Sequence, residues 1–392
     1  MSESAYRPLR AIGLMSGTSL DGVDAALVVT DGRADARGVL TCGPALTLAY
    51  DDSLRNRLRA VLSGAAPVLP MEQELTLWHA RAVEHLLARA GLDRTAIDVI
   101  GFHGQTVLHR PDLRLTWQIG DGATLARRTG ITVVNDFRTA DIDHGGQGAP
   151  LVPIYHTALA RTLPEGPLVV LNVGGVGNVT WIDRPDADGG QDSEGAPLLA
   201  FDTGPGNALI DDWVFRHTGA PCDRDGEKAQ AGRIDAATLA ALERDPYFDR
   251  PPPKSLDRND FSLERAGIES LSVADGAATL TAFTACAVAR AVPHFPKRPV
   301  RWLVCGGGRR NPALMAALRQ HLAAPVDAVE RVGWDGDALE AQAFAFLAVR
   351  SLYGLPLTFP GTTGAPRALT GGVRHPCGQE GPFTSGQTNM MC

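Results

Sequence analysis

The stretch Gly13-Leu14-Met15-Ser16-Gly17-Thr18-Ser19-Leu20-Asp21-Gly22-Val23-Asp24 decides the fold of this chain. An apolar run leads into it, and a second β-rich run follows it. The small residues in between therefore predict a turn between two strands, in which glycine lets backbone N–H groups approach an anion closely. A Walker A loop would need a Lys followed by a helix, and this turn has neither. The turn is a candidate phosphate-binding β-hairpin, and an ordinary tight turn is the alternative.

Two further Gly-rich turns follow apolar runs later in the chain. Gly174-Gly175-Val176-Gly177 lies between two β-rich runs. A Rossmann fingerprint read from Gly175 would place its third glycine on Thr180, inside the second run, so that motif is excluded. Gly306-Gly307-Gly308 follows an apolar run and precedes a helix predicted from Pro312. Each half of the chain therefore contains a strand, a Gly-rich turn and another strand, which is a weak internal repeat of structure.

A phosphate-binding β-hairpin in each half resembles the actin-like ATPase superfamily. The resemblance implies an α/β protein with two RNase H-like domains and a nucleotide cleft between them, with the third turn beside the adenosine. We place the first domain at residues 1–140 and 338–373, because we expect the last helix to return to it, and the second at residues 141–337. Residues 374–392 are polar and rich in Gly and Pro, and we expect them to form a disordered tail.

The rest of the sequence predicts helices and strands mixed in both halves. Gly91 is expected to end one helix as its C-cap residue, and Asp121 and Asp275 are expected to begin two others. Residues 246–257 contain three consecutive prolines and must be extended or irregular, and residues 184–197 predict a polar surface loop. The longer predicted helices cover residues 52–62, 72–90, 275–292 and 337–352, and the predicted strands cover residues 9–15, 25–30, 39–48, 99–103, 132–134, 168–173, 178–183, 198–202 and 301–305.

The composition limits the partners of the chain. Its 392 residues carry a formal net charge of −7, which disfavours nonspecific binding of nucleic acid. No segment reaches the ~20 apolar residues that a membrane helix needs, and Asp21 and Asp24 interrupt the N-terminal apolar stretch, so that it is no signal peptide. We therefore expect a cytoplasmic protein. The six cysteines form no C-x-x-C pair and predict reduced thiols rather than a metal cluster.

Two carboxylates lie within the first turn. Asp21 and Asp24 would repel bound phosphates unless a cation lay between them, and Mg²⁺ is commonly held by one or two carboxylates together with water. We therefore predict that Asp21 binds Mg²⁺ through water. The alternative is that Asp21 caps the turn with its side chain, and this alternative is stronger for Asp24.

Several long motifs, in order, resemble the anhydro-N-acetylmuramic acid kinase family. The resemblance covers most of residues 9–373, and leaves out residues 184–197 and the tail. Besides the opening stretch, the motifs are Gly101-Phe102-His103-Gly104-Gln105-Thr106, Asn135-Asp136-Phe137-Arg138, Gly145-Gly146-Gln147-Gly148-Ala149-Pro150-Leu151, Asn172-Val173-Gly174-Gly175, Phe201-Asp202-Thr203-Gly204-Pro205-Gly206-Asn207 and Glu340-Ala341-Gln342-Ala343-Phe344-Ala345.

The resemblance implies an ATP-dependent kinase that hydrolyses the 1,6-anhydro bond of 1,6-anhydro-N-acetylmuramic acid and phosphorylates O6. The product would be N-acetylmuramic acid 6-phosphate, in the recycling of cell-wall peptidoglycan. ATP and Mg²⁺ would be the cofactors, and the partners would be a small-molecule sugar and a second copy of the chain in a homodimer. By the same resemblance, the ATP-binding residues are Gly17, Thr18, Ser19, Leu20, Asp21, Gly22, Val23, Asp24, Gly174, Gly175, Gly306, Gly307, Gly308 and Asn311.

Asp202 is the catalytic base that the resemblance implies. Opening the anhydro bridge needs a nucleophilic water, and a carboxylate can remove its proton as the base does in inverting glycoside hydrolysis. The sequence places Asp202 at the end of a strand, before a Thr-Gly-Pro-Gly turn that would direct its side chain into a cleft. The alternative is a carboxylate that only holds the loop.

Four residues are candidates for binding the sugar: Glu340, Arg138, Gln147 and His103. Glu340 lies in the first turn of a predicted helix, where it would also complement the helix dipole. Arg138 would pair with the lactyl carboxylate of a muramic sugar or with the phosphates, and a surface ion pair is the alternative. For His103 the alternative is a core histidine whose hydrogen bonds are satisfied.

Three other functions remain open. A kinase of this fold that acts on another sugar or on a carboxylate would also need an Asp base, so Asp202 alone does not discriminate. A catalytically silent sugar sensor would be expected to lack Asp202 or the hairpin glycines, and both are present. A chaperone-type ATPase would need a peptide-binding domain, for which the residues after Val373 are too few.

Overall fold

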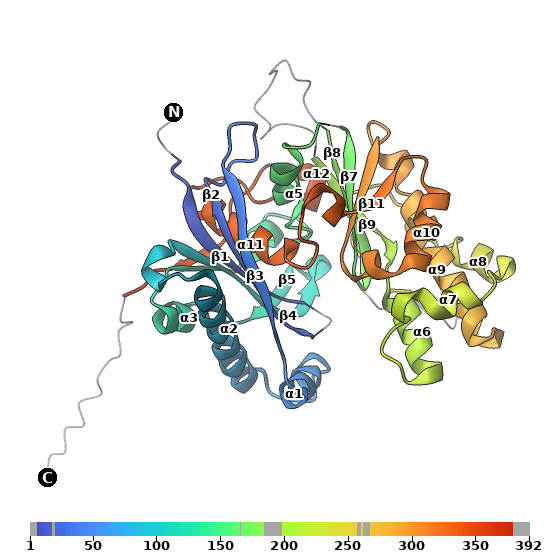
Figure 1. The fold of residues 1–392 in the computed structure, drawn as a ribbon, viewed down its shortest axis with the longest axis horizontal. Helices are drawn as coiled ribbons and strands as arrows, with labels where there is room; N and C mark the ends of the chain where they lie inside the picture. The colour runs from blue at the N-terminus through green and yellow to red at the C-terminus, as the bar shows by residue number, and fades with distance from the viewer. Residues whose placement is uncertain are drawn as a thin grey trace, which may run out of the picture.

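The computed structural model describes residues 6–17, 20–164, 166–183, 198–256, 260–261 and 267–378. Within these ranges the chain forms two β-sheets in two lobes that lie side by side (Figure 1). The predictions for Thr18, Ser19, the loop at 184–197 and most of the tail fall outside the described residues.

The first sheet gathers the N-terminal strands. β1, β2 and β3 are antiparallel neighbours, whereas β4 and β6 run parallel to β1 on its other side, and β5 and β12 add antiparallel strands to β4 and β6. The strands are β1 (Leu9–Ser16), β2 (Gly22–Thr30), β3 (Leu40–Ala49), β4 (Val99–Arg110), β5 (Leu115–Ile119), β6 (Val133–Asn135) and β12 (Val373–His375).

The second sheet repeats the same plan. β7, β8 and β9 are antiparallel neighbours, and β10 and β11 run parallel to β7 on its other side. In both sheets the core strand order is thus third, second, first, fourth, fifth, which confirms the predicted pair of RNase H-like sheets. The strands are β7 (Leu168–Val173), β8 (Val176–Ile182), β9 (Leu198–Pro205), β10 (Arg301–Cys305) and β11 (Val326–Ala328).

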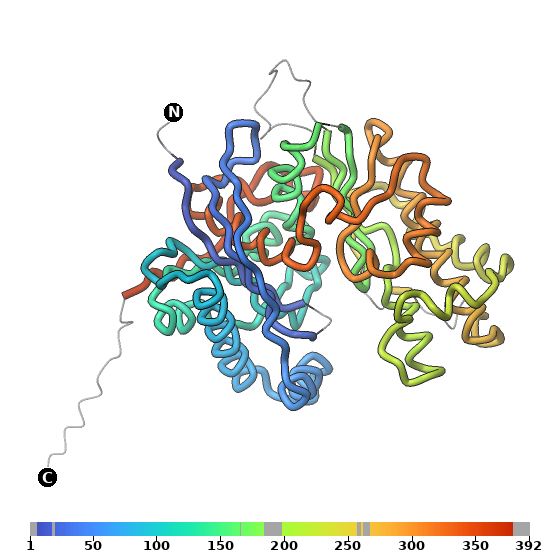
Figure 2. The backbone as a smooth tube through the Cα atoms, in the orientation of Figure 1, coloured from blue at the N-terminus to red at the C-terminus, as the bar shows by residue number. Residues whose placement is uncertain are grey.

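A buried helix near the C-terminus returns to the first sheet. Helix α11 (Leu339–Leu352) packs on β1, β2 and β4, and Figure 2 shows this late segment among the blue N-terminal strands. Glycines make this close approach possible: a Cβ on Gly13 would lie 1.7 Å from the Ala341 carbonyl oxygen, and one on Gly101 would lie 2.0 Å from that of Phe344. The last long helix therefore returns to the first sheet, as predicted, while the exact domain limits stay a prediction.

The other helices cover the two sheets. α2, of 23 residues, packs on β2 and β3, and α9 packs on β9 and on α6, α7, α8 and α10. The left-handed Gly91 ends α2 and Asp121 caps α3, both as predicted. The helices are α1 (Asp52–Leu62), α2 (Val68–Ala90), α3 (Gly122–Thr129), α4 (Thr139–Asp143), α5 (Pro153–Ala160), α6 (Ala208–Thr218), α7 (Glu227–Ala231), α8 (Ala236–Leu242), α9 (Val273–Ala289), α10 (Pro312–His321) and α12 (Pro360–Thr363).

Several predicted boundaries are wrong, among them the start of α9 and the start of the tail. Ser272, not Asp275, caps α9, because its Oγ accepts a hydrogen bond of 3.1 Å from the Asp275 N–H, and the Asp275 carboxylate binds the N–H of Arg233 at 2.7 Å. Strand β12 pairs with β6 over its whole length from Val373 to His375. Arg374 and His375, the first two residues assigned to the tail, therefore belong to the sheet.

Two results concern membranes and thiols. Within the ranges that the structure describes, no helix combines the length and the apolar character needed to cross a bilayer. The five cysteines of the described part are free thiols.

Candidate active site

The first Gly-rich turn connects β1 and β2, as predicted. Its base is anchored to the first sheet, because the buried Ser16 hydroxyl donates to Oε1 of Gln105 at 2.6 Å and lies 2.8 Å from the hydroxyl of Tyr50. Leu20 adopts a positive φ of 57°, and a Cβ on Gly22 would lie 2.5 Å from the Leu48 carbonyl oxygen. The turn is therefore tight and firmly held where its described residues meet the sheet.

The second turn, between β7 and β8, leaves room beside its glycines. A Cβ on Gly174 or Gly175 would meet no atom closer than 3.6 Å, and neither residue has a positive φ. Neither local packing nor backbone conformation therefore requires glycine at these two positions, and the absence of side chains leaves space for a ligand. The carbonyl oxygens of both are held by the N–H groups of Gly206, Asn207 and Ala208, at 2.8–3.2 Å.

The third turn lies against the second. A Cβ on Gly306 would lie 2.3 Å from Oδ1 of Asn172, and one on Gly308 would lie 2.6 Å from a Val173 methyl group, whereas one on Gly307 would meet nothing closer than 3.8 Å. Gly306 and Gly308 thus permit the close packing of the two turns, whereas a side chain at Gly307 would meet its neighbours only at an ordinary contact distance. Asn311 is buried and its Oδ1 caps α10 through the N–H of Leu314, so any bond to a ligand would have to come from its amide nitrogen.

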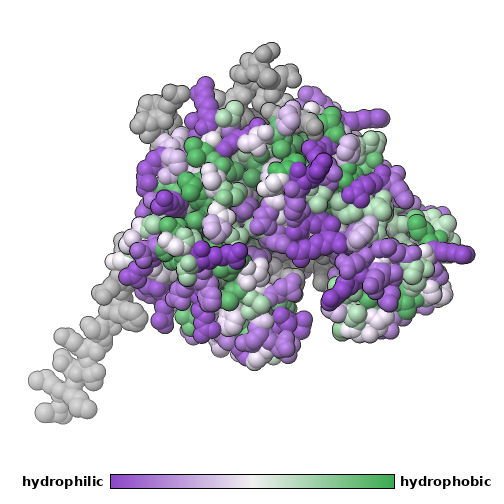
Figure 3. Space-filling model, in the orientation of Figure 1, coloured by the Kyte–Doolittle hydropathy of each residue, from purple (hydrophilic) through white to green (hydrophobic). Residues whose placement is uncertain are grey.

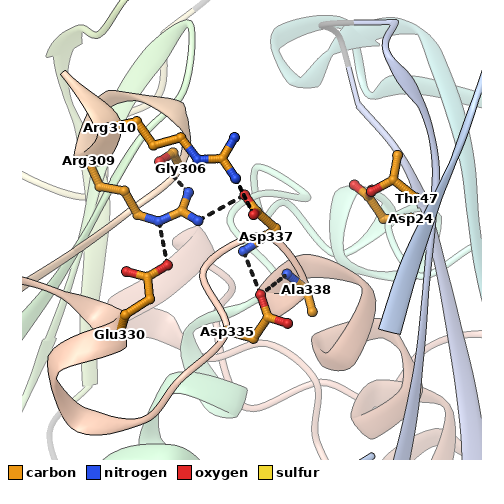
Figure 4. A network of polar contacts seen from close by, with 9 residues as sticks. All are labelled: Asp24, Thr47, Gly306, Arg309, Arg310, Glu330, Asp335, Asp337 and Ala338. Carbon is orange, nitrogen blue, oxygen red and sulfur yellow. Dashed lines mark hydrogen bonds and ion pairs between the residues drawn. The ribbon is translucent and has the colours of Figure 1, made fainter. Parts of the chain in front are cut away.

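An ion-pair network ties the third turn to the start of α11. Arg309 donates to Glu330 at 2.7 Å and to Asp337 at 2.8 Å, and Arg310 also binds Asp337. Figure 4 shows both arginines reaching from the 3-10 helix η10 (Gly307–Arg310) toward Asp337, with Asp24 apart from them on the far side. The residues that precede α11, and hence the first turn that carries Glu340, are therefore held by the second lobe.

Three carboxylates, of Asp337, Asp21 and Asp335, lie within electrostatic reach of the Asp24 carboxyl group. Burial, and to a lesser extent the carboxylates of Asp337, Asp21 and Asp335, raise the pKa of Asp24 to about 6, against the lowering effect of the Thr47 hydroxyl. Thr47 donates to Asp24 at 2.5 Å. Like charges gathered in this way favour a cation between them, although no group of three or more metal-ligating side chains occurs in the described ranges.

The predicted residues Arg138 and His103 contact each other. Nε and Nη2 of Arg138 both donate to Nε2 of His103, at 3.2 and 3.0 Å. A guanidinium only donates, so the His103 proton is on Nδ1, which donates to the Gly104 carbonyl at 2.8 Å. Burial first, then the Arg138 charge, holds the pKa of His103 well below its usual range. His103 is thus neutral, and both of its ring nitrogens have partners.

Glu340 lies within electrostatic reach of Arg138 and of Asp24. Burial raises the pKa of Glu340, the Asp24 carboxylate raises it further, and the guanidinium of Arg138 lowers it. Burial lowers the pKa of Arg138 to about 10, whereas Glu340 and Asp141 raise it. Asp24 of β2, Arg138 directly before α4 and Glu340 of α11 are therefore brought together from positions far apart in the sequence.

The loop that carries Gln147 is anchored by the buried Asp141. The Asp141 carboxylate accepts from the N–H of Gly148 at 2.6 Å and from the hydroxyl of Thr363 at 2.7 Å, and the N–H of Gln147 donates to the Thr363 carbonyl at 2.8 Å. The Gly148 carbonyl in turn accepts from Nη1 of Arg138 at 2.7 Å. The loop therefore also fixes the guanidinium.

Asp202 lies within β9, not at its end, because the strand continues to Pro205. It pairs with Asn178 of β8, three residues beyond Gly175, so it lies at the same end of the sheet as the second turn. Its Oδ2 accepts from the N–H of Leu256 at 2.8 Å. Burial raises the pKa of Asp202 to about 7, and the Leu256 hydrogen bond opposes that rise. A half-buried carboxylate with such a pKa suits proton transfer near neutral pH.

The surface is hollowed between the two lobes. On the face drawn in Figure 3, a notch opens between them, and its rim is mostly hydrophilic. A polar rim of this kind fits a charged or hydroxyl-rich ligand rather than an apolar one.

A family model fits almost the entire described chain. The model for anhydro-N-acetylmuramic acid kinase matches residues 9–377. The chain belongs to the anhydro-N-acetylmuramic acid kinase family. It is similar to the anhydro-N-acetylmuramic acid kinase of Paramagnetospirillum magneticum, with 58% identity over 93% of this chain and 99% of that protein. The enzyme of the same name from Rhodospirillum rubrum is also 58% identical, over 93% of this chain and 94% of that protein.

Membership of this kinase family makes the chain a kinase, and the structure adds residues that the sequence did not single out. Arg309, Asp337 and Asp141 hold site loops through contacts between residues far apart in the sequence. Lys254 and Tyr247 both lie in the Pro-rich segment, and both contact the main chain of Asp202. The only feature of the sequence that could have pointed to Lys254 is its position directly after three prolines, in a segment that was expected only to be irregular.

Proposed function

We propose that this chain transfers the γ-phosphoryl group of ATP to O6 of 1,6-anhydro-N-acetylmuramic acid while water opens the anhydro bond. The product is N-acetylmuramic acid 6-phosphate, which serves the recycling of cell-wall peptidoglycan. The observation that carries the proposal is Asp202, a half-buried carboxylate with a pKa of about 7, at the same end of the sheet as a turn whose glycines Gly174 and Gly175 are not required by local packing.

Asp202 acts as the general base in this reaction. It takes a proton from the water whose oxygen forms a bond to C1 of the sugar, and the bond between C1 and O6 breaks. O6 keeps the electron pair of that bond and attacks the γ-phosphorus, and the bond to the leaving ADP oxygen breaks. A base that is about half ionised near pH 7 can take the proton and release it again after turnover.

The three turns bind ATP in this proposal. The phosphates lie over the first and second turns, where the backbone of Gly17, Gly174 and Gly175 can approach them, and the adenosine lies beside Gly306 and Gly307. Gly174, Gly175 and Gly307 support this assignment, because neither packing nor a positive φ requires glycine at those three positions.

Mg²⁺ fits the carboxylates around Asp21 and Asp24. Burial is the main cause of the raised pKa of Asp24, and the three neighbouring carboxylates, which add to it, are the observation that favours a cation there. Asp21 is exposed at the end of the turn and would hold the ion through water. When bound, Mg²⁺ neutralises charge on the transferring phosphates.

The sugar is bound by Arg138, Glu340 and Gln147, and His103 supports Arg138. The ion pairs found among the described residues do not include Arg138, although it is a half-buried cation. An anion of the substrate, the lactyl carboxylate, would therefore complete its surroundings. Because both ring nitrogens of His103 are already bonded, we assign His103 the orientation of Arg138 rather than a direct contact with the sugar.

Three finer assignments accompany the function. An enzyme that consumes ATP is placed in the cytoplasm, where ATP is available. A homodimer is the oligomeric state that the family resemblance implies, and size-exclusion chromatography with light scattering would test it. The position of the cleft at the boundary of two domains, residues 1–140 with 338–373 and residues 141–337, remains part of the proposal.

A substrate panel tests the proposal. Coupled measurement of ADP release should detect ATP consumption with 1,6-anhydro-N-acetylmuramic acid and only background with glucose or N-acetylglucosamine. If the rates with glucose and N-acetylglucosamine equal the rate with the anhydro sugar, the chain is a general sugar kinase. Asp202→Asn should still bind ATP, but its rate should be ~10²–10⁴-fold lower, which is the usual contribution of a general base.

A further inference from the structure

A segment after the three prolines is paired with Asp202. The N–H of Asp202 donates to the Lys254 carbonyl at 3.0 Å, and the N–H of Leu256 donates to Oδ2 of Asp202 at 2.8 Å. The proposed base is therefore held through its main chain and its carboxylate by residues two apart in one segment. The orientation of its side chain depends on where that segment lies.

Lys254 fixes this segment from within the protein. It is only 8% exposed, which is unusual for a lysine, and the ion pairs of the described residues do not include it. Its Nζ donates to the carbonyls of Tyr247 and Phe248, at 3.3 and 3.5 Å, and lies 4.7 Å from the centre of the Tyr247 ring. A buried ammonium is costly unless its partners are well placed, so these contacts hold Lys254 in one position.

Tyr247 closes the arrangement. Its ring is buried, and its hydroxyl donates to the main-chain carbonyl of Asp202 at 2.5 Å. Asp202 bonds to the Lys254 segment, Lys254 bonds to the carbonyl of Tyr247, and Tyr247 bonds back to Asp202. The three residues thus form a closed ring of contacts around the proposed base.

We propose that Lys254 and Tyr247 are positioning residues, which hold the segment at residues 252–256 against β9 so that the Leu256 N–H orients the Asp202 carboxylate for proton abstraction. This inference rests on the proposed role of Asp202 as base. Neither residue needs to touch the sugar, because both act through the Leu256 N–H and the backbone of Asp202.

The arrangement has a measurable electrostatic consequence. A hydrogen bond from the Leu256 N–H stabilises the ionised form of Asp202, and burial opposes ionisation. Displacing the segment removes the hydrogen bond and leaves burial, so the pKa of Asp202 rises. Loss of the Lys254 charge would act in the same direction, so a variant without a charge change is needed. The charged and titratable groups around Asp202 and Lys254 are Tyr247, Asp249, Arg250, Arg290 and His294.

The test is the pH dependence of kcat for ADP release with the anhydro sugar, in four variants compared with the wild type and with Asp202→Asn. Tyr247→Phe removes only the hydroxyl, and Lys254→Met removes the ammonium group. Both should move the acidic limb of the profile upward by about one pH unit, the scale of one hydrogen bond to a charged group. At pH 6 kcat should therefore fall about tenfold more than at pH 9. Lys254→Arg keeps the positive charge, so most of the shift of the acidic limb should disappear in this variant. Lys228→Met, on the exposed side of α7, is the control and should match the wild type.

The outcomes separate the two levels of the proposal. If the wild type turns over and Asp202→Asn does not, but Tyr247→Phe keeps the wild-type profile, the positioning role of Tyr247 is refuted. A uniform loss of kcat at every pH in both variants would indicate a purely structural role and would also refute the inference. If the wild type does not act on the anhydro sugar, or Asp202→Asn keeps its rate, the proposed function itself fails. Should Lys254→Met not fold, Tyr247→Phe and Lys254→Arg still decide the question.

Discussion

Arg138 donates two hydrogen bonds to a single atom, Nε2 of His103, at 3.0 and 3.2 Å. The contact fixes the tautomer of the histidine and keeps it neutral, because burial and the adjacent guanidinium hold the pKa of His103 well below its usual range. It also fixes the guanidinium, whose Nη1 binds the Gly148 carbonyl. A pair that would look like two independent ligands of the sugar is thus one unit, in which the histidine orients the arginine.

Replacing His103 should weaken binding of the sugar rather than stop the chemistry. His103→Phe keeps the ring that packs 4.6 Å from Phe344 but removes the acceptor. We expect KM for the anhydro sugar to rise about tenfold or more, the scale of a hydrogen bond to a charged group, with a smaller change in kcat. Steady-state kinetics would measure this, and His85→Asn on the exposed face of α2 is the control. An unchanged KM would mean that Arg138 does not depend on His103.

The second turn allows a test that separates binding from folding. A Cβ on Gly175 meets its nearest atom, the Cβ of Ala208, at an ordinary 3.6 Å, and the residue has no positive φ. Gly175→Ala should therefore leave Tm nearly unchanged while it raises KM for ATP, because the methyl group would occupy the space of a phosphate.

Gly206→Ala, directly after β9 and against the second turn, is the opposite case. Its Cβ would lie 2.3 Å from the Gly174 carbonyl oxygen, so this variant should lower Tm. A wild-type KM for ATP in Gly175→Ala would remove the second turn from the phosphate site.

The raised pKa of Asp202 also predicts how stability depends on pH. The carboxyl has an ordinary pKa of 3.8 and a pKa of about 7 in the folded protein. The folded state therefore binds more protons between these values, so Asp202 costs stability progressively as pH rises from about 4 to about 7. We expect Asp202→Asn to have a higher Tm than the wild type at pH 8 and a similar Tm at pH 4. Calorimetric scans at both pH values would measure this, and equal Tm values at pH 8 would contradict the burial of an ionised Asp202.

The acidic group at the first turn should control the need for magnesium. Asp21→Asn keeps the size of the side chain and removes its charge. We expect the Mg²⁺ concentration for half-maximal activity to rise about tenfold or more, as for other groups that bind a metal through water, with activity recovered at saturating Mg²⁺. Asp52→Asn, exposed at the start of α1, is the matched control. The same Mg²⁺ requirement in both variants would leave Asp21 with a role in the turn alone.

The sequence predicted the sheets well because their strands are local and strongly patterned. The hairpins around Gly17 and Gly174 were visible as apolar runs interrupted by glycine, and the structure has both between antiparallel strands. The family motifs also marked Arg138 and Glu340, which the structure brings within electrostatic reach of each other. Patterns that repeat over a few residues were thus sufficient for most of the fold.

The missed features depend on contacts between residues far apart in the chain. Asp202 was expected at the end of a strand, because a Gly-Pro-Gly sequence follows it, but pairing with β8 extends the strand to Pro205. The Ser272 side chain competes with Asp275 for the start of α9, and both residue types are good caps. Lys254 was overlooked because nothing in a run of prolines reveals that its ammonium group turns inward onto Tyr247.

The most direct measurement compares two sugars that differ by one water molecule. Release of ADP should be followed under identical conditions with 1,6-anhydro-N-acetylmuramic acid and with N-acetylmuramic acid, in which the bridge is already open. If Asp202 activates water at C1 and O6 is the group released, we predict rapid ADP formation and a 6-phosphorylated product with the anhydro sugar, and little with the open one. Equal or faster phosphorylation of the open sugar would show that Asp202 only deprotonates a hydroxyl, and would contradict the coupled opening of the bridge.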